Sequence, residues 1–349
     1  MRLALRYRLV GPQGQPPGGE RVDRALWIAQ DRLTGGTVVL KCARMGTAAA
    51  DELVAEGGRL ASLAHPGLVQ LADRFVDVEG LGALSGVAVV GFASRWVDGT
   101  PFDEAVRGLP VDRAMALFSK LLDVVDYLHR RGLLHLDLKP DNALVVDDEV
   151  VLLDLGSARS LDAGPGEAGG TLGHAAPEVL LGQAASVAAD IYSLGGMLYA
   201  LLTGQPAFVG LEGIELRRAT LAGEVVPVCA RAPRASRPLA RLAEAMLARH
   251  ASDRPASVAA VQQALRAAGG VVSRRPGAPP MVGRADALAR LEALVQVPGG
   301  GVICVTGPPG SGRTRLVHAL LSSPERLGGR QVLDLSGVED VIRGLDGLA

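Results

Sequence analysis

The sequence has few cysteines and few lysines. The cysteines bear on disulfides and metal sites, and the lysines bear on phosphate binding. Its three cysteines, Cys42, Cys229 and Cys304, stand singly, so they predict neither a disulfide framework nor a metal site, as in a reducing cytoplasm. No apolar run approaches the length of a transmembrane helix, about 18 residues, and no signal-peptide pattern opens the chain. We therefore expect a cytoplasmic protein without membrane contact. A net charge of −1 likewise predicts no nucleic-acid partner.

Only three of the 36 basic residues are lysines: Lys41, Lys120 and Lys139. Lysine binds phosphate as a compact point charge, whereas arginine presents a broad planar fork. A chain that otherwise uses arginine has kept the ammonium group at these positions. Lys41 and Lys139 are therefore candidate phosphate contacts, while Lys120 is expected to be a solvated helix residue.

The most informative stretch is HLDLKPDN, from His135 to Asn142. An amphipathic helix precedes it, with apolar residues every three or four positions, Asp112 as its expected N-cap and Gly132 as its C-cap. A β-hairpin is predicted after it and leads into the tripeptide DLG at residues 154–156. The stretch is thus expected to be a loop between a helix and a hairpin.

This loop and hairpin bring Asp137, Asn142 and Asp154 to one end of the predicted structure. Phosphoryl transfer needs such a set, because a carboxylate must orient the hydroxyl nucleophile and hard oxygen ligands must hold Mg²⁺ on a nucleotide's phosphates. The three residues therefore predict a phosphoryl-transfer site.

HLDLKPDN resembles the catalytic loop of protein kinases, and DLG resembles the family's metal-binding D-F-G motif with leucine for phenylalanine. A lysine two positions after the catalytic aspartate is typical of the serine/threonine branch. The resemblance implies a role for each polar residue: Asp137 as catalytic base, Lys139 as γ-phosphate contact, Asn142 and Asp154 as Mg²⁺ ligands, and His135 as a structural residue.

The N-terminal part is similar to the kinase hairpin that ends in the V-A-I-K lysine, here VVLK at residues 38–41. Strands are predicted over 3–10, 25–29 and 37–40. The resemblance implies that Lys41 bridges the α- and β-phosphates of ATP and that Val39 lies against the adenine. Lys41 would pair with Glu56 on the next helix, with Glu52 as the main competitor.

The glycine-rich loop that covers the phosphates in this family is incomplete in this sequence. Alignment back from Lys41 leaves only Gly19 of its three glycines, although their backbone N–H groups must approach phosphates without an intervening Cβ. The alternative is a shifted loop, in which Gly14, Gly18 and Gly19 cover the phosphates. The next helix, predicted over 51–64, contains Gly57 and Gly58, each unfavourable by about 1 kcal/mol relative to alanine. We expect that helix to be marginal alone and to be ordered by nucleotide or a partner.

A buried strand is predicted over 87–97, and WVDG at residues 96–99 resembles the kinase hinge. By this resemblance Trp96 belongs to the hinge beside the nucleotide, and Ser94 is the gatekeeper. A small gatekeeper predicts a roomy back pocket.

Residues beyond Gly156 resemble an activation segment, because GTLGHAAPE at 170–178 is similar to G-T-x-x-Y-x-A-P-E. The resemblance implies that Thr171 bonds toward Asp137. It also implies two structural contacts further along the chain: Glu178 with Arg254, and Asp190 with the backbone of the catalytic loop.

Leu136 occupies the place where kinases switched by loop phosphorylation usually carry an arginine. Without that cation, a phosphate on Ser157 or Ser160, the only hydroxyl-bearing residues between Gly156 and Thr171, has no partner in the catalytic loop. Control without activation-loop phosphorylation is therefore expected.

A second motif lies after a Gly/Pro-rich linker at 269–280. A predicted strand enters GPPGSGRT at residues 307–314, which fits a P-loop with Gly307, Gly312 and Thr314 in place and Arg313 for the usual lysine. Residues 281–349 resemble the start of signal-transduction ATPases of the STAND and AAA-like kind. Arginine cannot reproduce the lysine's point contact, so hydrolysis is not expected there.

Together these features predict an α+β, two-lobed kinase-like fold with a partial α/β P-loop segment. The expected divisions are a β-rich N-lobe at 1–98, a helical C-lobe at 99–268, the linker, and the P-loop segment, with regulatory domains possible beyond residue 349. The expected function is transfer of the ATP γ-phosphate to protein serine or threonine hydroxyls with Mg²⁺. Two alternatives stay open: a pseudokinase that senses nucleotide and regulates the P-loop segment, and a protein whose main activity is the P-loop ATPase.

Overall fold

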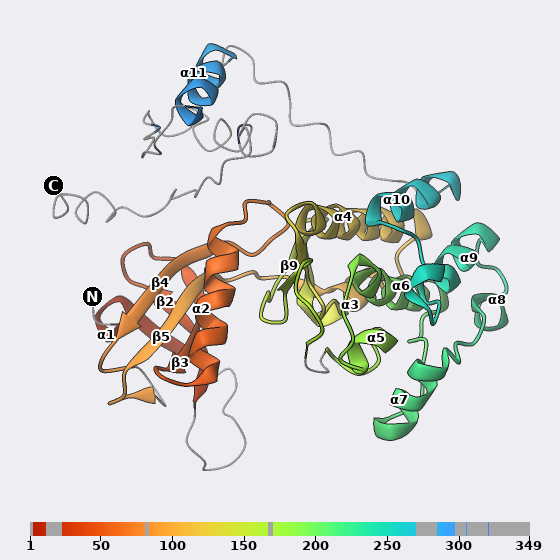
Figure 1. Cartoon of the computed structure of the whole chain (residues 1–349), viewed down its shortest axis with the longest axis horizontal. Coiled ribbons are helices and arrows are strands. Elements are labelled where there is room, and N and C mark those ends of the chain that lie inside the picture. The colour runs from red at the N-terminus through yellow and green to blue at the C-terminus, as the bar shows by residue number, and fades with distance from the viewer. Residues whose placement is uncertain are drawn as a thin grey trace. The chain divides into compact units, whose positions relative to one another are not determined.

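The computed structural model describes residues 3–11, 23–80, 84–166, 170–269 and 285–296, with Val305 and Leu320. The chain divides into two compact units: one contains Met1–Leu60 and His65–Ser273, and the other contains Ala61–Ala64 and Arg274–Ala349. Figure 1 shows the first unit as a sheet-rich part followed along the chain by a largely helical part. Within the described residues no helix combines the length and the apolarity needed to cross a bilayer.

The sheet-rich part is a five-stranded antiparallel sheet in the order β1-β2-β3-β5-β4. Its core includes Ala93, Trp27 and Leu40, and the last two alternate with more exposed neighbours, as expected for a sheet with one face in a core. The strands are β1 (Tyr7–Gly11), β2 (Arg24–Asp31), β3 (Thr37–Arg44), β4 (Leu71–Asp77) and β5 (Val89–Arg95).

The strand predicted over residues 3–10 is wrong in its first half, because Leu3–Arg6 forms a short helix, α1, before β1. Contacts with distant residues hold this turn: the Leu3 backbone N–H donates to Asp77, and Arg6 forms an ion pair with Asp31 at 3.0 Å. Both acceptors are buried and lie far along the chain. Alternation within the N-terminal segment could not reveal them.

Helix α2 (Ala48–Ala61) packs against the sheet, and its two glycines have different surroundings (Figure 1). A Cβ added to Gly57 would lie 3.2 Å from Phe92 Cδ1 on β5, whereas one added to Gly58 would meet nothing within 4 Å. Gly57 therefore allows the close approach of α2 to β5. Gly58 weakens the helix without such a packing reason.

This difference predicts opposite outcomes for two similar substitutions. Gly58→Ala should raise the free energy of unfolding by about 0.5–1 kcal/mol, because alanine restricts the unfolded chain and favours helix. Gly57→Ala should lose that gain, because its methyl group pushes α2 away from Phe92. Urea unfolding of both variants measures the difference, and an equal gain in the two would contradict this account of Gly57.

The helical part is built around α6 (Val187–Thr203), whose residues are mostly buried and which packs on α4 (Val111–Arg130) and α9 (Arg237–Met246). Its remaining helices are α3 (Phe102–Val106), α5 (Pro177–Leu180), α7 (Gly213–Ala222), α8 (Val228–Arg231) and α10 (Val258–Ala267), with 3₁₀ turns η2 (Pro140–Asn142) and η3 (Ala251–Asp253). Short strands β6 (Thr100–Pro101), β8 (Ala143–Val146) and β9 (Glu149–Leu152) form one sheet, and β7 (Leu133–Leu134) pairs with β10 (Arg159–Ser160).

Two expectations about α4 are wrong in detail. The helix begins at Val111 after Pro110, so Asp112 lies in the first turn and is not the N-cap. Lys120 is not a solvated residue: its ammonium lies 2.8 Å from Glu149 on the β8–β9 hairpin, with only 15% of the side chain exposed. Gly132 has a φ of 74° just past the helix, as a C-terminal glycine should.

In the second unit, helix α11 (Ala285–Val295) packs Leu291 and Val295 around Leu320 and Val305. The P-loop residues Gly307, Gly312, Arg313 and Thr314 lie outside the described residues, as does Gly19 of the glycine-rich loop.

Candidate active site

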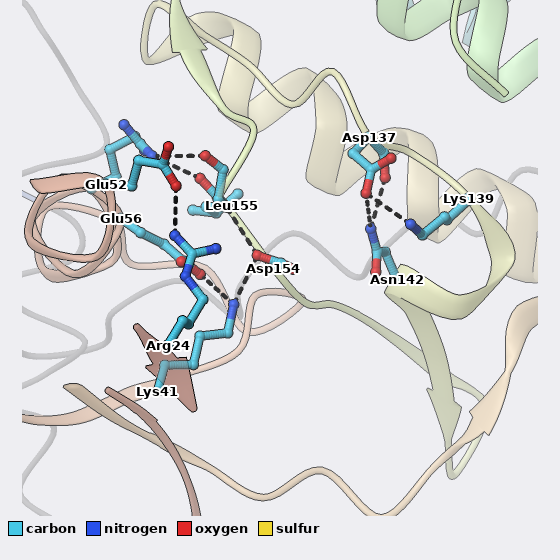
Figure 2. Close-up of polar contacts among 11 residues, drawn as sticks. Arg24, Lys41, Glu52, Glu56, Asp137, Lys139, Asn142, Asp154 and Leu155 are labelled. Atoms are coloured by element: carbon cyan, nitrogen blue, oxygen red, sulfur yellow. Dashed lines mark hydrogen bonds and ion pairs between the residues drawn. The ribbon is translucent and has the colours of Figure 1, made fainter. Parts of the chain in front are cut away.

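Lys41 of β3 joins two acidic groups from different parts of the chain. Its ammonium lies 2.6 Å from Glu56 Oε1 on α2 and 2.8 Å from Asp154 Oδ1, in the turn that follows β9 (Figure 2). Glu52, the competing candidate, instead forms an exposed ion pair with Arg24 at 2.5 Å. The helical spacing explains the choice: Glu56 lies on the buried face of α2 with Leu53 and Leu60, whereas Glu52 faces outward.

The two carboxyl groups beside Lys41 differ in their electrostatics. Burial raises the pKa of Glu56 above its ordinary value, and the Lys41 charge only partly offsets this. Burial acts in the same sense on Asp154, but the Lys41 charge and hydrogen bonds from Lys41 and the Gly156 N–H outweigh it, so the pKa of Asp154 falls to about 2. Asp154 is therefore ionised at neutral pH, and its negative charge lies beside the Lys41 ammonium.

A buried carboxylate, that of Asp190, holds the backbone of the loop that contains Asp137. Asp190 of α6 accepts the backbone N–H groups of His135 and Leu136, each at 2.8 Å. Leu136 has a φ of 63°, a strained value for a non-glycine residue, and these two bonds hold it there. Burial would raise the pKa of Asp190, but its hydrogen bonds with the His129 side chain and the His135 backbone N–H hold that pKa below its ordinary value.

His129 is a residue whose contact the sequence did not reveal. Its Nε2 lies 2.8 Å from Asp190 Oδ2, and its side chain is only 8% exposed. His135, expected to be structural, is fully buried, and burial lowers the pKa of its ring. Asp190 thus contacts the side chain of His129 and the backbone of His135.

Asp137 is surrounded by hydrogen-bond donors. Its Oδ1 accepts the Thr171 hydroxyl at 2.6 Å, and its Oδ2 accepts Lys139 Nζ at 2.9 Å and Asn142 Nδ2 at 3.0 Å. Burial opposes ionisation, but these donors prevail and lower the pKa of Asp137. Figure 2 shows Lys139 and Asn142 both directed at this carboxylate, which is therefore ionised and held in one orientation.

Val39, Ser94 and Trp96 lie where β3 and β5 meet the connection to the helical part. Val39 and Ser94 are register partners on β3 and β5, and Ser94 is 6% exposed. Trp96 follows β5, its backbone N–H donates to the Thr37 carbonyl at 3.1 Å, and the residue is 39% exposed. The residues predicted to lie around the adenine are therefore adjacent at these strand ends.

The residues of the expected activation segment make the expected long-range contacts. Thr171 contacts Asp137, and Arg254 forms a two-pronged ion pair with Glu178 at 2.7 and 2.9 Å. Ser160 lies in β10, which pairs with β7 beside the catalytic loop. The segment is thus joined to the helical part at both ends.

Comparison with known proteins agrees with this geometry. Residues 27–266 match the protein kinase domain family, which is more than half of the chain. The chain belongs to the protein kinase family. The two-lobed arrangement of a β-sheet part and a helical part is the kinase fold, as the sequence predicted.

Several serine/threonine-protein kinases resemble this kinase domain. PknJ of Mycobacterium tuberculosis is 36% identical over 171 residues, 46% of this chain and 28% of the relative. A probable serine/threonine-protein kinase of Streptomyces coelicolor is 30% identical over 227 residues, 60% of this chain and 32% of the relative. Calcium/calmodulin-dependent protein kinase type 1 of Macrobrachium nipponense is 34% identical over 181 residues, half of each chain. The matched region therefore spans half or less of each relative.

Proposed function

We propose that this kinase domain transfers the γ-phosphate of ATP to serine or threonine hydroxyls of proteins. The observation that carries the proposal is the contact of Lys41 with both Glu56 and Asp154, beside an Asp137 that is ionised and oriented by three side chains. Positioned charges of this kind are what phosphoryl transfer requires.

In this proposal each residue has a separate task. Lys41 contacts the α- and β-phosphates, and Glu56 fixes the position of the Lys41 ammonium. Asp137 orients the substrate hydroxyl and accepts its proton, while the Lys139 ammonium, 2.9 Å away, stabilises negative charge on the transferred phosphoryl group. Val39, Ser94 and Trp96 line the adenine side of the site, and Gly19 belongs to the loop over the phosphates.

Asn142 and Asp154 fit the role of Mg²⁺ ligands. Asn142 donates through Nδ2 to Asp137, so its carbonyl oxygen is directed elsewhere, and the pKa of about 2 keeps Asp154 ionised. Bound Mg²⁺ would neutralise charge on the phosphates. Hard oxygen donors from one or two side chains are the usual protein contribution to such a site, with phosphate oxygens and water completing it.

The test is Mg²⁺-dependent transfer of labelled γ-phosphate from ATP to the protein itself and to a basic protein substrate, with ATP binding measured on the same sample. Transfer that is lost when Mg²⁺ is chelated supports the proposal. ATP binding without transfer would overturn it in favour of the alternative, a nucleotide-sensing pseudokinase. That alternative is motivated by the glycine loop, of which only Gly19 remains, and by Leu136. Absence of binding would overturn both.

The proposal includes a link to a P-loop ATPase region at residues 281–349, which rests on the sequence GPPGSGRT alone. In it Gly307 and Gly312 shape the phosphate loop, Thr314 contacts Mg²⁺, and Arg313 weakens hydrolysis. ATPase turnover that survives Asp137→Asn but is lost in Thr314→Ala would make this region, and not the kinase domain, the main activity.

Leu136 leads to a prediction about regulation. It is 7% exposed and contributes only apolar surface beside the activation segment, so position 136 offers no cation to a phosphate on Ser157 or Ser160. The double variant Ser157→Ala, Ser160→Ala should therefore keep phosphate transfer within about threefold of the wild type, since Lys41 contacts Glu56 and Asp154 without any phosphate on the loop. Phosphatase treatment of the wild type should have the same small effect, and loss of transfer in either sample would contradict the prediction.

A further inference from the structure

Arg59 links helix α2 to the turn that contains Asp154 by a route that does not pass through Lys41. It lies near the C-terminal end of α2, three residues after Glu56, and its Nη2 donates to the Leu155 carbonyl at 2.9 Å and the Gly156 carbonyl at 3.3 Å. These are the two residues that follow Asp154. Glu56 and Arg59 therefore connect the same helix to the same turn, one through Lys41 and the other directly.

This contact involves a cation that is partly removed from water. Burial lowers the pKa of the Arg59 guanidinium, and the nearby Glu56 carboxylate opposes that shift. Hydrogen bonds to charged groups are stronger than those between neutral groups, especially where water is partly excluded. The two carbonyls thus offset the desolvation of Arg59 only while α2 and the Asp154 turn stay together.

Helix α2 needs such support because of its own composition. Gly57 and Gly58 lie in its interior and weaken it, and Gly57 is required for the approach to Phe92. Its outward-facing acid, Glu52, is engaged in the exposed pair with Arg24 and does not reach Lys41. Leu53 and Leu60 supply buried apolar contacts, which are not directional and so do not by themselves fix the position of the helix.

The residues around Arg59 indicate that its hydrogen bonds take the place of a link through a phosphate on the activation segment. Arg59 lines a cavity of about 320 Å³ together with Leu136, Ser157, Arg159 and Val179. Because Leu136 is apolar, a phosphate in this cavity would have no cation from the catalytic loop to join α2 to the activation segment. Arg59 makes a connection to that segment's first residues without any phosphate.

We propose that Arg59 is a positioning residue that holds α2 against the Asp154 turn and so keeps Glu56, Lys41 and Asp154 in contact without loop phosphorylation. The proposal rests on the proposed kinase function for its activity readout. The nucleotide affinity of the site depends on the same contact, because Lys41 and Asp154 are the charges that face the phosphates and their metal.

The test compares Arg59→Met, which keeps most of the stem, with Arg59→Lys, which keeps the charge. Arg59→Met should lower kcat/KM for ATP by about 10- to 100-fold, the range of one or two charge-assisted hydrogen bonds. Arg59→Lys should recover part of the loss. Glu52→Gln is the matched control on the same helix: it removes the exposed pair with Arg24 and should change kcat/KM by less than about threefold.

A double-mutant cycle separates positioning from general stabilisation. If Arg59 acts through the Glu56–Lys41 contact, adding Arg59→Met to Glu56→Gln should lower kcat/KM much less than it does in the wild type. Fully multiplicative losses would overturn the proposal. So would an Arg59→Met protein whose loss of activity only follows a fall in its melting temperature.

Amide exchange and Mg²⁺–ATP affinity test the same contact without phosphate transfer. Arg59→Met should increase exchange in α2 and in residues 154–156 and weaken Mg²⁺–ATP binding, with unchanged exchange in α6. If the wild type binds Mg²⁺–ATP but transfers nothing, these two measurements still decide the role of Arg59, while the proposed function alone fails. Unchanged exchange and affinity would overturn the role of Arg59 even in an active kinase.

Discussion

Asp137→Asn should lower the rate of phosphate transfer by about 10²- to 10⁴-fold, the usual contribution of a positioned general base. The substitution preserves the size of the side chain but replaces one oxygen by an NH₂ group. That group can face either the Lys139 ammonium or the Thr171 hydroxyl, both of which now donate to the carboxylate. It can neither accept the substrate proton nor carry the negative charge that orders its neighbours.

ATP affinity should change far less, because Lys41, Glu56 and Asp154 make their contacts without Asp137. Steady-state transfer and equilibrium ATP binding, measured side by side, therefore separate the two effects. Asp148→Asn is a suitable control, since Asp148 is a solvent-exposed partner of Arg113 at the hairpin turn, with 64% of its side chain exposed. Transfer by Asp137→Asn at the wild-type rate would remove Asp137 as the base and the proposed mechanism with it.

The parts of this site that could be predicted from the sequence are those with fixed local spacing. Asp137 and Asn142 lie in one loop, and Asp154 follows a hairpin of predictable length, so their approach depends on local geometry alone. Glu56 could be chosen over Glu52 only through resemblance, because both lie on the same short helix. The structure supplies the physical reason, which is that Glu56 lies on the buried face of α2.

Contacts between residues far apart in the sequence were harder to predict. Arg59 and its carbonyl acceptors are 96 and 97 residues apart, and His129 and Asp190 are 61 residues apart. A histidine or arginine on an amphipathic helix has the same local pattern whether it meets solvent or a buried acceptor. Its partner is set by how the helices and the sheet pack, which no periodicity records.

The same limit explains the errors in the secondary structure. Helix α1 depends on Asp77 and Asp31, which lie far along the chain. By contrast α4 has a strong apolar pattern, and its two ends were predicted within a few residues. Where burial is encoded in the segment itself the prediction succeeded, and where a single polar contact decides the conformation it failed.

Arg254→Leu should lower the free energy of unfolding by about 3–5 kcal/mol, the typical result of breaking a buried ion pair from one side. All five N–H groups of this guanidinium have acceptors at 2.7–3.0 Å: both carboxylate oxygens of Glu178 and the backbone carbonyls of Ala188, Ala248 and Arg249. The guanidinium also lies over the Tyr192 ring, 4.9 Å from its centroid. Leucine would leave a buried carboxylate and three carbonyls without these donors.

Arg254→Lys should recover only a small part of this loss, because an ammonium group has three donors and cannot match the planar fork. Urea unfolding measures both variants, with Arg113→Leu as the control. Arg113 forms an exposed ion pair with Asp148, so its loss should change stability by less than about 1 kcal/mol.

The double variant Glu178→Leu, Arg254→Leu tests the cause: if the unpaired carboxylate dominates the loss, removing it as well should restore stability relative to Arg254→Leu. If the double variant instead loses the full sum of both single losses, the stabilisation by Arg254 comes from its contacts with the backbone carbonyls and Tyr192. In that case the unpaired carboxylate is not the main cause of the loss.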